Sequence, residues 1–318
     1  MDCLVCQHAE TIEKHLLYDD RYGHKGLFEL LQCKNCEHQF LKTAPKINEL
    51  GDLYTDFYPR KSFNPDNFRA YKAGGKLYNW LVGGRASACQ SVEPNSKVLD
   101  IGCGYGETLA YLQNEKSCDV YGVDADRNVE IIAEKYGFKI HVGIFDSSLY
   151  ASNFFDFVTM NQVIEHVPDI HETFNMISEV LKPGGRCVLS TPNANGWGSR
   201  LFRKKWLNWH TPYHQHFLSI DSVHLLGERY GFTVESIETI TRSEWFMYQL
   251  LHVIHYPKQG VPSAFWASFA VKSTRSKKFL QRVILATWFL CIPQLITRLF
   301  DSIGIGDNYL IILKKKQL

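Results

Sequence analysis

From Lys97 onward, hydrophobic and polar positions follow two alternating patterns. Short apolar runs alternate with stretches in which apolar residues recur every three or four positions, as on one face of a helix. The apolar runs predict strands at 98–101, 120–123, 139–142, 155–161, 186–190, 233–239 and 309–314. The periodic stretches predict helices at 108–115, 127–136, 170–181 and 219–230. Regular alternation of strand and helix predicts an α/β fold in which helices cover both faces of a parallel sheet.

Three regions depart from this rhythm and divide the chain. Residues 1–45 contain two cysteine pairs and few periodic elements, and residues 46–95 are typical of a linker with leading helices. The α/β domain is predicted over 96–318. Within it, residues 243–306 are rich in aromatic side chains and are predicted to form a helical insertion before the last strand.

Composition narrows the class of protein. The 318 residues are 45% hydrophobic and 21% charged, as in an ordinary globular protein, with a net charge of +2. Residues 197–282 carry 12 basic and 5 acidic residues, whereas residues 1–61 carry 8 basic and 10 acidic ones, so an anionic partner should meet the C-terminal part. An odd count of nine cysteines and the absence of a signal-peptide pattern predict a cytoplasmic protein. The apolar run 283–293 is shorter than the roughly 20 residues that span a bilayer.

A glycine-rich turn follows the first of these strands. It reads Asp100-Ile101-Gly102-Cys103-Gly104-Tyr105-Gly106, and glycines there let the backbone approach a ligand and turn sharply into a helix. A dinucleotide site needs a different glycine spacing, and Glu107 at the helix N-terminus would repel a pyrophosphate. S-adenosylmethionine carries an ammonium group, which suits acidic neighbours such as Asp100.

Polar residues also follow the next strands. Asp124 ends the second strand and is placed to bind ribose hydroxyls, and Asp146 follows the third strand, within reach of an adenine amino group. Either aspartate taken alone could instead cap a helix. The predicted cofactor-binding residues are Asp100, Gly102, Cys103, Gly104, Gly106, Asp124, Ala125, Asp146, Asn161 and Gln162.

Four motifs occur in order: the glycine loop with its strand (98–106), Val123-Asp124, Val163-Ile164-Glu165-His166-Val167 and Leu181-Lys182-Pro183-Gly184-Gly185. Over residues 95–242 and the final strand, the chain resembles the class I S-adenosylmethionine-dependent methyltransferases. Within that class it is most similar to the ubiquinone O-methyltransferases and the polysaccharide-cluster methyltransferases. The resemblance implies a Rossmann-like, seven-stranded, mostly parallel sheet and S-adenosylmethionine as cofactor.

Methylation of a hydroxyl group needs a base, and histidine titrates nearest to neutral pH. His166 follows the fourth strand, while His214 and His216 lie in a histidine-rich segment before a helix, together with His210. His166, His214 and His216 are the predicted catalytic residues. The alternative is that these histidines satisfy backbone groups of loops, and an amine or carbon acceptor would need no histidine base.

Two Cys-x-x-Cys pairs lie near the N-terminus. Cys3 and Cys6 are separated by 26 residues from Cys33 and Cys36, and four thiolates can form a closed tetrahedral zinc site. Because every ligand position is then taken, the predicted Zn²⁺ is structural. The alternatives are reduced thiols or a redox pair. A similar cysteine-rich module occurs in sugar methyltransferases and in some ribosomal RNA methyltransferases.

These patterns predict O-methylation of a small-molecule, sugar or glycan acceptor, which a lipid can carry. The alternative function is RNA methylation with a zinc ribbon that binds the substrate, but the negative charge of residues 1–61 disfavours nucleic acid. Basic and apolar residues mix around 277–293, which is typical of a helix in a membrane interface or of a buried lid over the active site. A helix in a membrane interface would make the protein membrane-associated.

Overall fold

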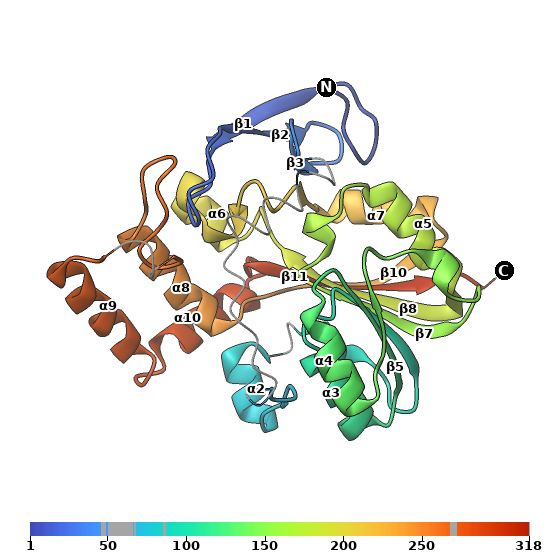
Figure 1. The fold of residues 1–318 in the computed structure, drawn as a ribbon. Coiled ribbons are helices and arrows are strands. Elements are labelled where there is room, and N and C mark those ends of the chain that lie inside the picture. The colour runs from blue at the N-terminus through green and yellow to red at the C-terminus, as the bar shows by residue number, and fades with distance from the viewer. Residues whose placement is uncertain (46–48, 50–65, 67, 85–86, 268–271, 318) are drawn as a thin grey trace.

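The computed structural model describes residues 1–45, 49, 66, 68–84, 87–267 and 272–317. Figure 1 shows a twisted central sheet with helices on both faces, a smaller sheet near the N-terminus and a group of helices at one side. The large sheet has seven strands in the order β10-β11-β8-β7-β4-β5-β6. They are β4 (Lys97–Ile101), β5 (Asp119–Asp124), β6 (Lys139–Val142), β7 (Phe155–Asn161), β8 (Leu181–Pro192), β10 (Phe232–Ile240) and β11 (Asn308–Lys315).

The pairing of these strands confirms the predicted fold class. β6, β5, β4, β7 and β8 pair in parallel, and β11 runs antiparallel to both β8 and β10. In an open parallel sheet the loops at the carboxyl ends of neighbouring strands converge at one edge, where ligands bind. The loops after β4, β5 and β7 therefore share that edge.

One strand boundary was predicted wrongly. β8 begins at Leu181 and includes the Pro183–Gly185 segment, which the sequence suggested as a break before a strand at 186. Leu181 pairs with Phe155 of β7, and the register shifts before Arg186 pairs with Phe157. An irregularity in the ladder thus accommodates the Pro-Gly-Gly segment within the sheet.

Helices pack on the two faces of the large sheet and form two apolar clusters. On one face lie α3 (Glu107–Lys116) and α4 (Asn128–Tyr136), and on the other α5 (Ile170–Val180) and α7 (Ile220–Arg229). Capping explains where two of them begin: the Asp169 side chain accepts backbone N–H groups at the start of α5, and Ser219 forms a capping box at the start of α7. Short helices α2 (Lys76–Val82) and η3 (Ala88–Ser91) precede the domain; much of the predicted linker lies outside the described residues.

The N-terminal segment forms a four-stranded antiparallel sheet. It contains β1 (Thr11–Leu17), β2 (Phe28–Cys33) and β3 (Gln39–Leu41), and its fourth strand is β9 (His216–Phe217) from the large domain. Leu30 and Leu41 of this sheet are buried against Trp206 and Trp209 of the domain. The small sheet is therefore completed by the large domain and shares an apolar core with it.

The predicted insertion is helical, with α8 (Ser243–Ile254), α9 (Arg275–Thr287) and α10 (Ile292–Ser302). In Figure 1 these helices lie beside the large sheet, and α9 is the most distant. No residue of α9 is buried, so the hypothesis that this helix is a buried lid is wrong. Among the described residues no single helix meets the length and hydropathy test for a membrane span; α9 and α10 pass it only together, with a bend of 66° between them.

Candidate functional site

The glycine loop joins β4 to α3 in the backbone conformation that its glycines permit. Gly102, Gly104 and Gly106 have φ values of +72°, +56° and +88°, in the left-handed region where a Cβ is disfavoured. A Cβ at Gly102 would lie 2.4 Å from a methyl carbon of Val163. At Gly104 the nearest atom to an added Cβ is a Glu107 carboxylate oxygen at 3.9 Å. The loop is thus packed against the protein at Gly102 and leaves room for a ligand at Gly104.

Asp124 lies beside this loop, at the end of β5. One carboxylate oxygen accepts a hydrogen bond from the Gly104 backbone N–H at 2.8 Å, and the other accepts one from Asp126 N–H at 2.8 Å. Ala125, the next residue, is exposed. Asp124 therefore ties the loop after β5 to the glycine loop, at the edge where a ribose was predicted.

The aspartate that opens the loop is inside the protein. Asp100 is 4% exposed and accepts a hydrogen bond from the Thr159 hydroxyl of β7 at 2.6 Å. Burial raises the pKa of Asp100 to about 7, with the nearby Asp124 charge acting in the same direction. Cys103 is also buried, with its side chain in an apolar cluster, so any contact of Cys103 with a cofactor involves its backbone.

The remaining predicted cofactor residues are spread along the same edge. Asn161 is exposed at the end of β7, and the next residue, Gln162, donates from its amide to the Ser190 hydroxyl of β8 at 2.8 Å. Asp146 is exposed and accepts the Ser148 backbone N–H at 2.8 Å, which caps a 3-10 turn (Ser147–Leu149). The capping alternative thus describes what Asp146 does in this structure, and its contact with adenine remains a prediction.

Two of the predicted catalytic histidines meet beside a buried glutamate. The rings of His166 and His214 lie edge to face with centroids 4.6 Å apart. Glu165, His166 and His214 each offer one ligand atom, and these atoms lie within 4.8 Å of one another. Glu165 is fully buried; one of its carboxylate oxygens accepts the Thr191 hydroxyl at 3.0 Å, and the other has no hydrogen-bond partner among the residues that the structure describes. In the sequence Glu165 stands out only as part of the Val163–Val167 motif, and its burial beside two histidines emerges only from the fold.

Backbone contacts fix the tautomer of both histidines. Nδ1 of His166 donates to the Tyr213 carbonyl at 2.9 Å, and Nδ1 of His214 donates to the Asn208 carbonyl at 2.7 Å. In a neutral imidazole the lone pair is then on Nε2. Each histidine can accept a proton or bind a metal ion through that atom.

Burial sets the protonation of this cluster, which we call the Glu-His cluster (Glu165, His166 and His214). Burial lowers the pKa of His166 to about 4 and that of His214 well below its ordinary value. Burial raises the pKa of Glu165 to about 8. At neutral pH both imidazoles are therefore uncharged, and Glu165 is the member of the cluster that titrates closest to neutral pH.

The other histidines of the segment have different neighbours. His216 lies in β9 and is buried against His38, with Nδ1 of His216 3.3 Å from Nε2 of His38. This pair lies within the small sheet, because Phe40 of β3 pairs with His216. His210 is buried near Tyr22, with ring centroids 5.8 Å apart. The structure therefore brings His166 and His214 together and gives His216 the contacts of a packing residue.

The four N-terminal cysteines converge at one end of the small sheet. Sγ of Cys3 lies 3.5 Å from that of Cys36, and Cys6 and Cys33 are separated by the same distance. All four Sγ atoms lie within 4.8 Å of one another, and no disulfide joins them. Zinc–sulfur bonds of about 2.3 Å in a tetrahedron place sulfur atoms about 3.8 Å apart, so the arrangement fits a Cys₄ zinc site.

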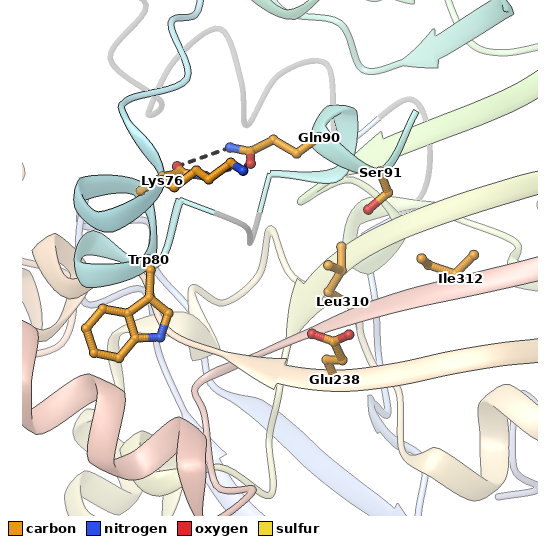
Figure 2. Close-up of a pocket in the computed structure, with 8 residues that line it drawn as sticks. Lys76, Trp80, Gln90, Ser91, Glu238, Leu310 and Ile312 are labelled. Atoms are coloured by element: carbon orange, nitrogen blue, oxygen red, sulfur yellow. Dashed lines mark hydrogen bonds between the residues drawn. The ribbon is translucent and has the colours of Figure 1, made fainter. Parts of the chain in front are cut away.

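A separate cavity lies on another part of the large domain. It has a volume of about 430 Å³ and lies between α2, η3 and the strands β10 and β11. Figure 2 shows Trp80 at one side and Glu238, Leu310 and Ile312 along the sheet. At the upper rim the side-chain amide of Gln90 is hydrogen-bonded to that of Asn79. The lining residues include none from the glycine loop or the Glu-His cluster. This cavity is thus distinct from the candidate cofactor site.

Comparisons with known proteins agree with this geometry. Residues 80–237 match the family model described as a methyltransferase domain. The chain is 33% identical over 115 residues to phosphoethanolamine N-methyltransferase 2 of Caenorhabditis elegans. This alignment covers 34% of this chain and 26% of that protein. The chain is 27% identical over 188 residues to a ubiquinone biosynthesis O-methyltransferase of Escherichia coli. This alignment covers 56% of this chain and 68% of that protein.

The fold matches as well. The crystal structure of Haemonchus contortus phosphoethanolamine N-methyltransferase 2 in complex with S-adenosyl-L-methionine superimposes with a TM-score of 0.51 at 18% identity. It covers 88% of this chain and 62% of that chain. A seven-stranded sheet with a glycine loop after its first strand defines a Rossmann-like methyltransferase fold. Residues 80–237 therefore form a methyltransferase domain of the class I S-adenosylmethionine-dependent type.

Proposed function

We propose that this chain transfers the methyl group of S-adenosylmethionine to a hydroxyl group of a small-molecule acceptor, namely a sugar or glycan that a lipid can carry. The observation that supports this most is the Glu-His cluster at the same sheet edge as the glycine loop. Methyl transfer to a hydroxyl group needs a proton acceptor, and the cluster places a buried carboxylate beside two imidazoles at this edge.

The loop residues have complementary tasks in binding the cofactor. Gly104 leaves space at the start of α3, where backbone N–H groups can meet a carboxylate. Asp124 holds that loop in place and offers its carboxylate to the ribose hydroxyls. Asp146, Asn161 and Gln162 extend the site along the edge toward the adenine and the acceptor. S-adenosylmethionine, when bound, supplies a methyl group that is already activated on a sulfonium.

The acceptor proton is the remaining chemical problem. Glu165 has a pKa of about 8, so it titrates near the working pH and its carboxylate is a stronger base than an ordinary carboxylate. His166 has a pKa of about 4 and is a weaker base. We therefore assign proton acceptance to Glu165, and assign to His166 and His214 contacts with other parts of the acceptor, whose remaining O–H or N–H groups can donate to Nε2. His216 is assigned no part in proton transfer.

We propose that Cys3, Cys6, Cys33 and Cys36 hold a structural Zn²⁺ ion. The supporting observations are the four converging thiols and the position of the small sheet, whose fourth strand begins two residues after His214. The bound ion would stabilise the small sheet and, through β9, the segment that carries His214. A cytoplasmic location also remains a proposal, supported by nine cysteines that form no disulfide.

The acceptor class rests on charge and on similarity. The module that would bind RNA in the alternative function is net negative, which favours a sugar or glycan over a nucleic acid. One relative is named for phosphoethanolamine and another for ubiquinone biosynthesis, and both names refer to small molecules. An amine acceptor would make Glu165 unnecessary, so the acceptor atom and the role of Glu165 are tested together.

The experiment incubates the purified chain with methyl-labelled S-adenosylmethionine and a panel of acceptors. The panel contains nucleotide-activated sugars, free glycans, a polyprenyl-linked saccharide, a short structured RNA and phosphoethanolamine. We expect label in a saccharide, with a mass gain of one methyl group at an oxygen. Label in RNA or phosphoethanolamine alone would refute the proposed acceptor, and absence of S-adenosylmethionine binding by calorimetry would refute the proposed activity.

A further inference from the structure

The helices α9 and α10 expose an unusual amount of apolar surface. Phe279 is 69% exposed, and Phe289 and Leu290 in the turn between the helices are 86% and 69% exposed. Leu280, Val283 and Leu285 of α9 are also exposed, as are Ile292, Leu295 and Leu299 of α10. So many exposed apolar side chains on two neighbouring helices are unusual for a monomeric soluble protein and mark an interaction surface.

The two faces of α9 differ in chemistry. With 3.6 residues per turn, Phe279, Leu280 and Val283 project from one side of the helix, while Lys278 and Arg282 project from the other. No residue of α9 is fully buried: Gln281, Ile284 and Thr287 are half-buried where α9 contacts α8, and the apolar side with Phe279, Leu280 and Val283 is exposed. Such a helix gains little stability from its tertiary contacts and needs a partner for its apolar side.

The orientation of α10 supports the same conclusion. Its polar residues face the protein: the Thr297 hydroxyl contacts that of Ser243 at 2.8 Å, and Arg298 pairs with Asp301 at 2.8 Å and donates to the Trp80 carbonyl at 2.8 Å. Leu295 and Leu299 face outward. This reverses the usual distribution of a helix on a water-soluble domain, and these polar contacts hold α10 against the protein while its apolar side stays outside.

Charge identifies the partner. Between Lys272 and Phe300 the chain carries six basic residues and no acidic residue. A second copy of this chain would bring cations against cations across the interface. A bilayer with anionic lipids offers both an apolar interior and negative headgroups. Figure 1 shows α9 at the margin of the molecule, where a flat surface can reach it.

We propose that α9, the α9–α10 turn and the outer face of α10 form a membrane-binding surface that lies in the interface of a bilayer containing anionic lipid. The exposed phenylalanines and leucines enter the boundary between headgroups and acyl chains. Lys277, Lys278 and Arg282 meet the headgroup phosphates. The inference stands apart from methyl transfer, since none of these residues belongs to the glycine loop or the Glu-His cluster.

The test measures co-sedimentation of the full chain with sucrose-loaded vesicles. One set of vesicles is phosphatidylcholine alone, and the other contains roughly 30% phosphatidylglycerol, which gives its surface a negative potential. We expect the chain to bind the anionic vesicles more tightly. Because each basic residue near such a surface contributes about fivefold in partitioning, K277Q/K278Q/R282Q should reduce binding roughly 100-fold.

A second variant tests the apolar contribution. F279S/F289S/L290S should lose binding to both kinds of vesicle. The matched control is I131S/I144S/L149S, which removes three exposed apolar side chains elsewhere and should bind like the wild type. S-adenosylmethionine affinity and the circular dichroism melting curve, measured on every variant, establish that each one is folded.

Three outcomes overturn the proposal. The first is no binding of the folded wild type to either vesicle, and the second is equal loss of binding in the control variant. The third is a wild-type dimer in light scattering without vesicles that F279S/F289S/L290S converts to a monomer, since a second copy of the chain would then cover this face.

Discussion

The substitution Glu165→Gln separates the chemistry proposed for the Glu-His cluster from its contribution to the fold. Glutamine keeps the shape of the side chain and can still accept the Thr191 hydroxyl that lies 3.0 Å from the carboxylate. It removes the ionisable group without creating a cavity. The variant should therefore fold, and its S-adenosylmethionine affinity should stay within about threefold of the wild type, since a side chain that does not contact the cofactor contributes little to that affinity.

The expected change in rate follows from the lost base. General base catalysis contributes about 10²- to 10⁴-fold, so the methyl-transfer rate of Glu165→Gln should fall by roughly that factor. In the wild type the rate should rise with pH until Glu165 is ionised, near its pKa of about 8, and then level off. The variant should lack this rise.

Stability should change with pH in the opposite direction. The folded-state pKa of Glu165, about 8, is raised above the ordinary value of 4.5, so the folded state holds its proton longer than the unfolded state. The resulting stabilisation is complete below pH 4.5 and is lost as the pH rises through about 8. Between pH 6 and pH 9 the ionisation of Glu165 should lower the free energy of unfolding by about 3 kcal/mol. Each pH unit below the folded pKa accounts for about 1.4 kcal/mol of this loss, and little is lost above that pKa.

Urea unfolding at pH 6 and pH 9 measures this loss, and labelled cofactor measures the rate. Asp100 and Asp307, with pKa values of about 7, also contribute to the wild-type loss, so the difference between wild type and variant isolates Glu165. Glu134→Gln, on the exposed surface of α4, is the control and should behave like the wild type. If Glu165→Gln keeps the rise in rate with pH and the full loss of stability, the assignment of Glu165 as the base is wrong.

Three further predictions concern the cofactor loop and the cysteines. Asp124→Ala should weaken S-adenosylmethionine binding in calorimetry by about 1–3 kcal/mol, because it leaves the Gly104 N–H unpaired and removes the ribose acceptor; unchanged affinity would exclude Asp124 from the site. Gly102→Ala should lower the free energy of unfolding by about 1–3 kcal/mol, since its Cβ would meet Val163 at 2.4 Å, whereas Gly137→Ala meets no such neighbour and should cost less. Elemental analysis should find one zinc ion per chain, and chelation or Cys33→Ser should lower the melting temperature; a chain that contains no metal and melts unchanged with chelator would contradict the zinc site.

Much of the large domain follows from local patterns in the sequence. Strands such as β4 and β5 are short apolar runs with a clear end, and the glycines after β4 need a turn that only their φ values permit. Helix ends were predictable where a capping side chain or a glycine marks them, as at Ser219 and Gly137. These signals act within a few residues, so a single sequence carries them.

The parts that were missed depend on contacts between distant residues. The strand β9 has two residues, and it exists because His216 and Phe217 pair with β3, which lies far away in the chain. The pKa of Glu165 depends on its burial, which the motif around it does not reveal. The outward-facing leucines of α10 have ordinary helical spacing, and only the folded chain shows which side of that helix meets the protein.

Because β3 pairs with β9 of the large domain, the N-terminal segment is not a self-contained module. Deleting residues 1–45 would remove the side chains that cover Trp206 and Trp209 and expose both tryptophans of the large domain to water. If residues 1–45 were grafted onto another enzyme, β3 would lose its pairing partner β9 and become an unpaired edge strand. Shuffling of such units in evolution therefore has to carry a stretch of the large domain along with the cysteines.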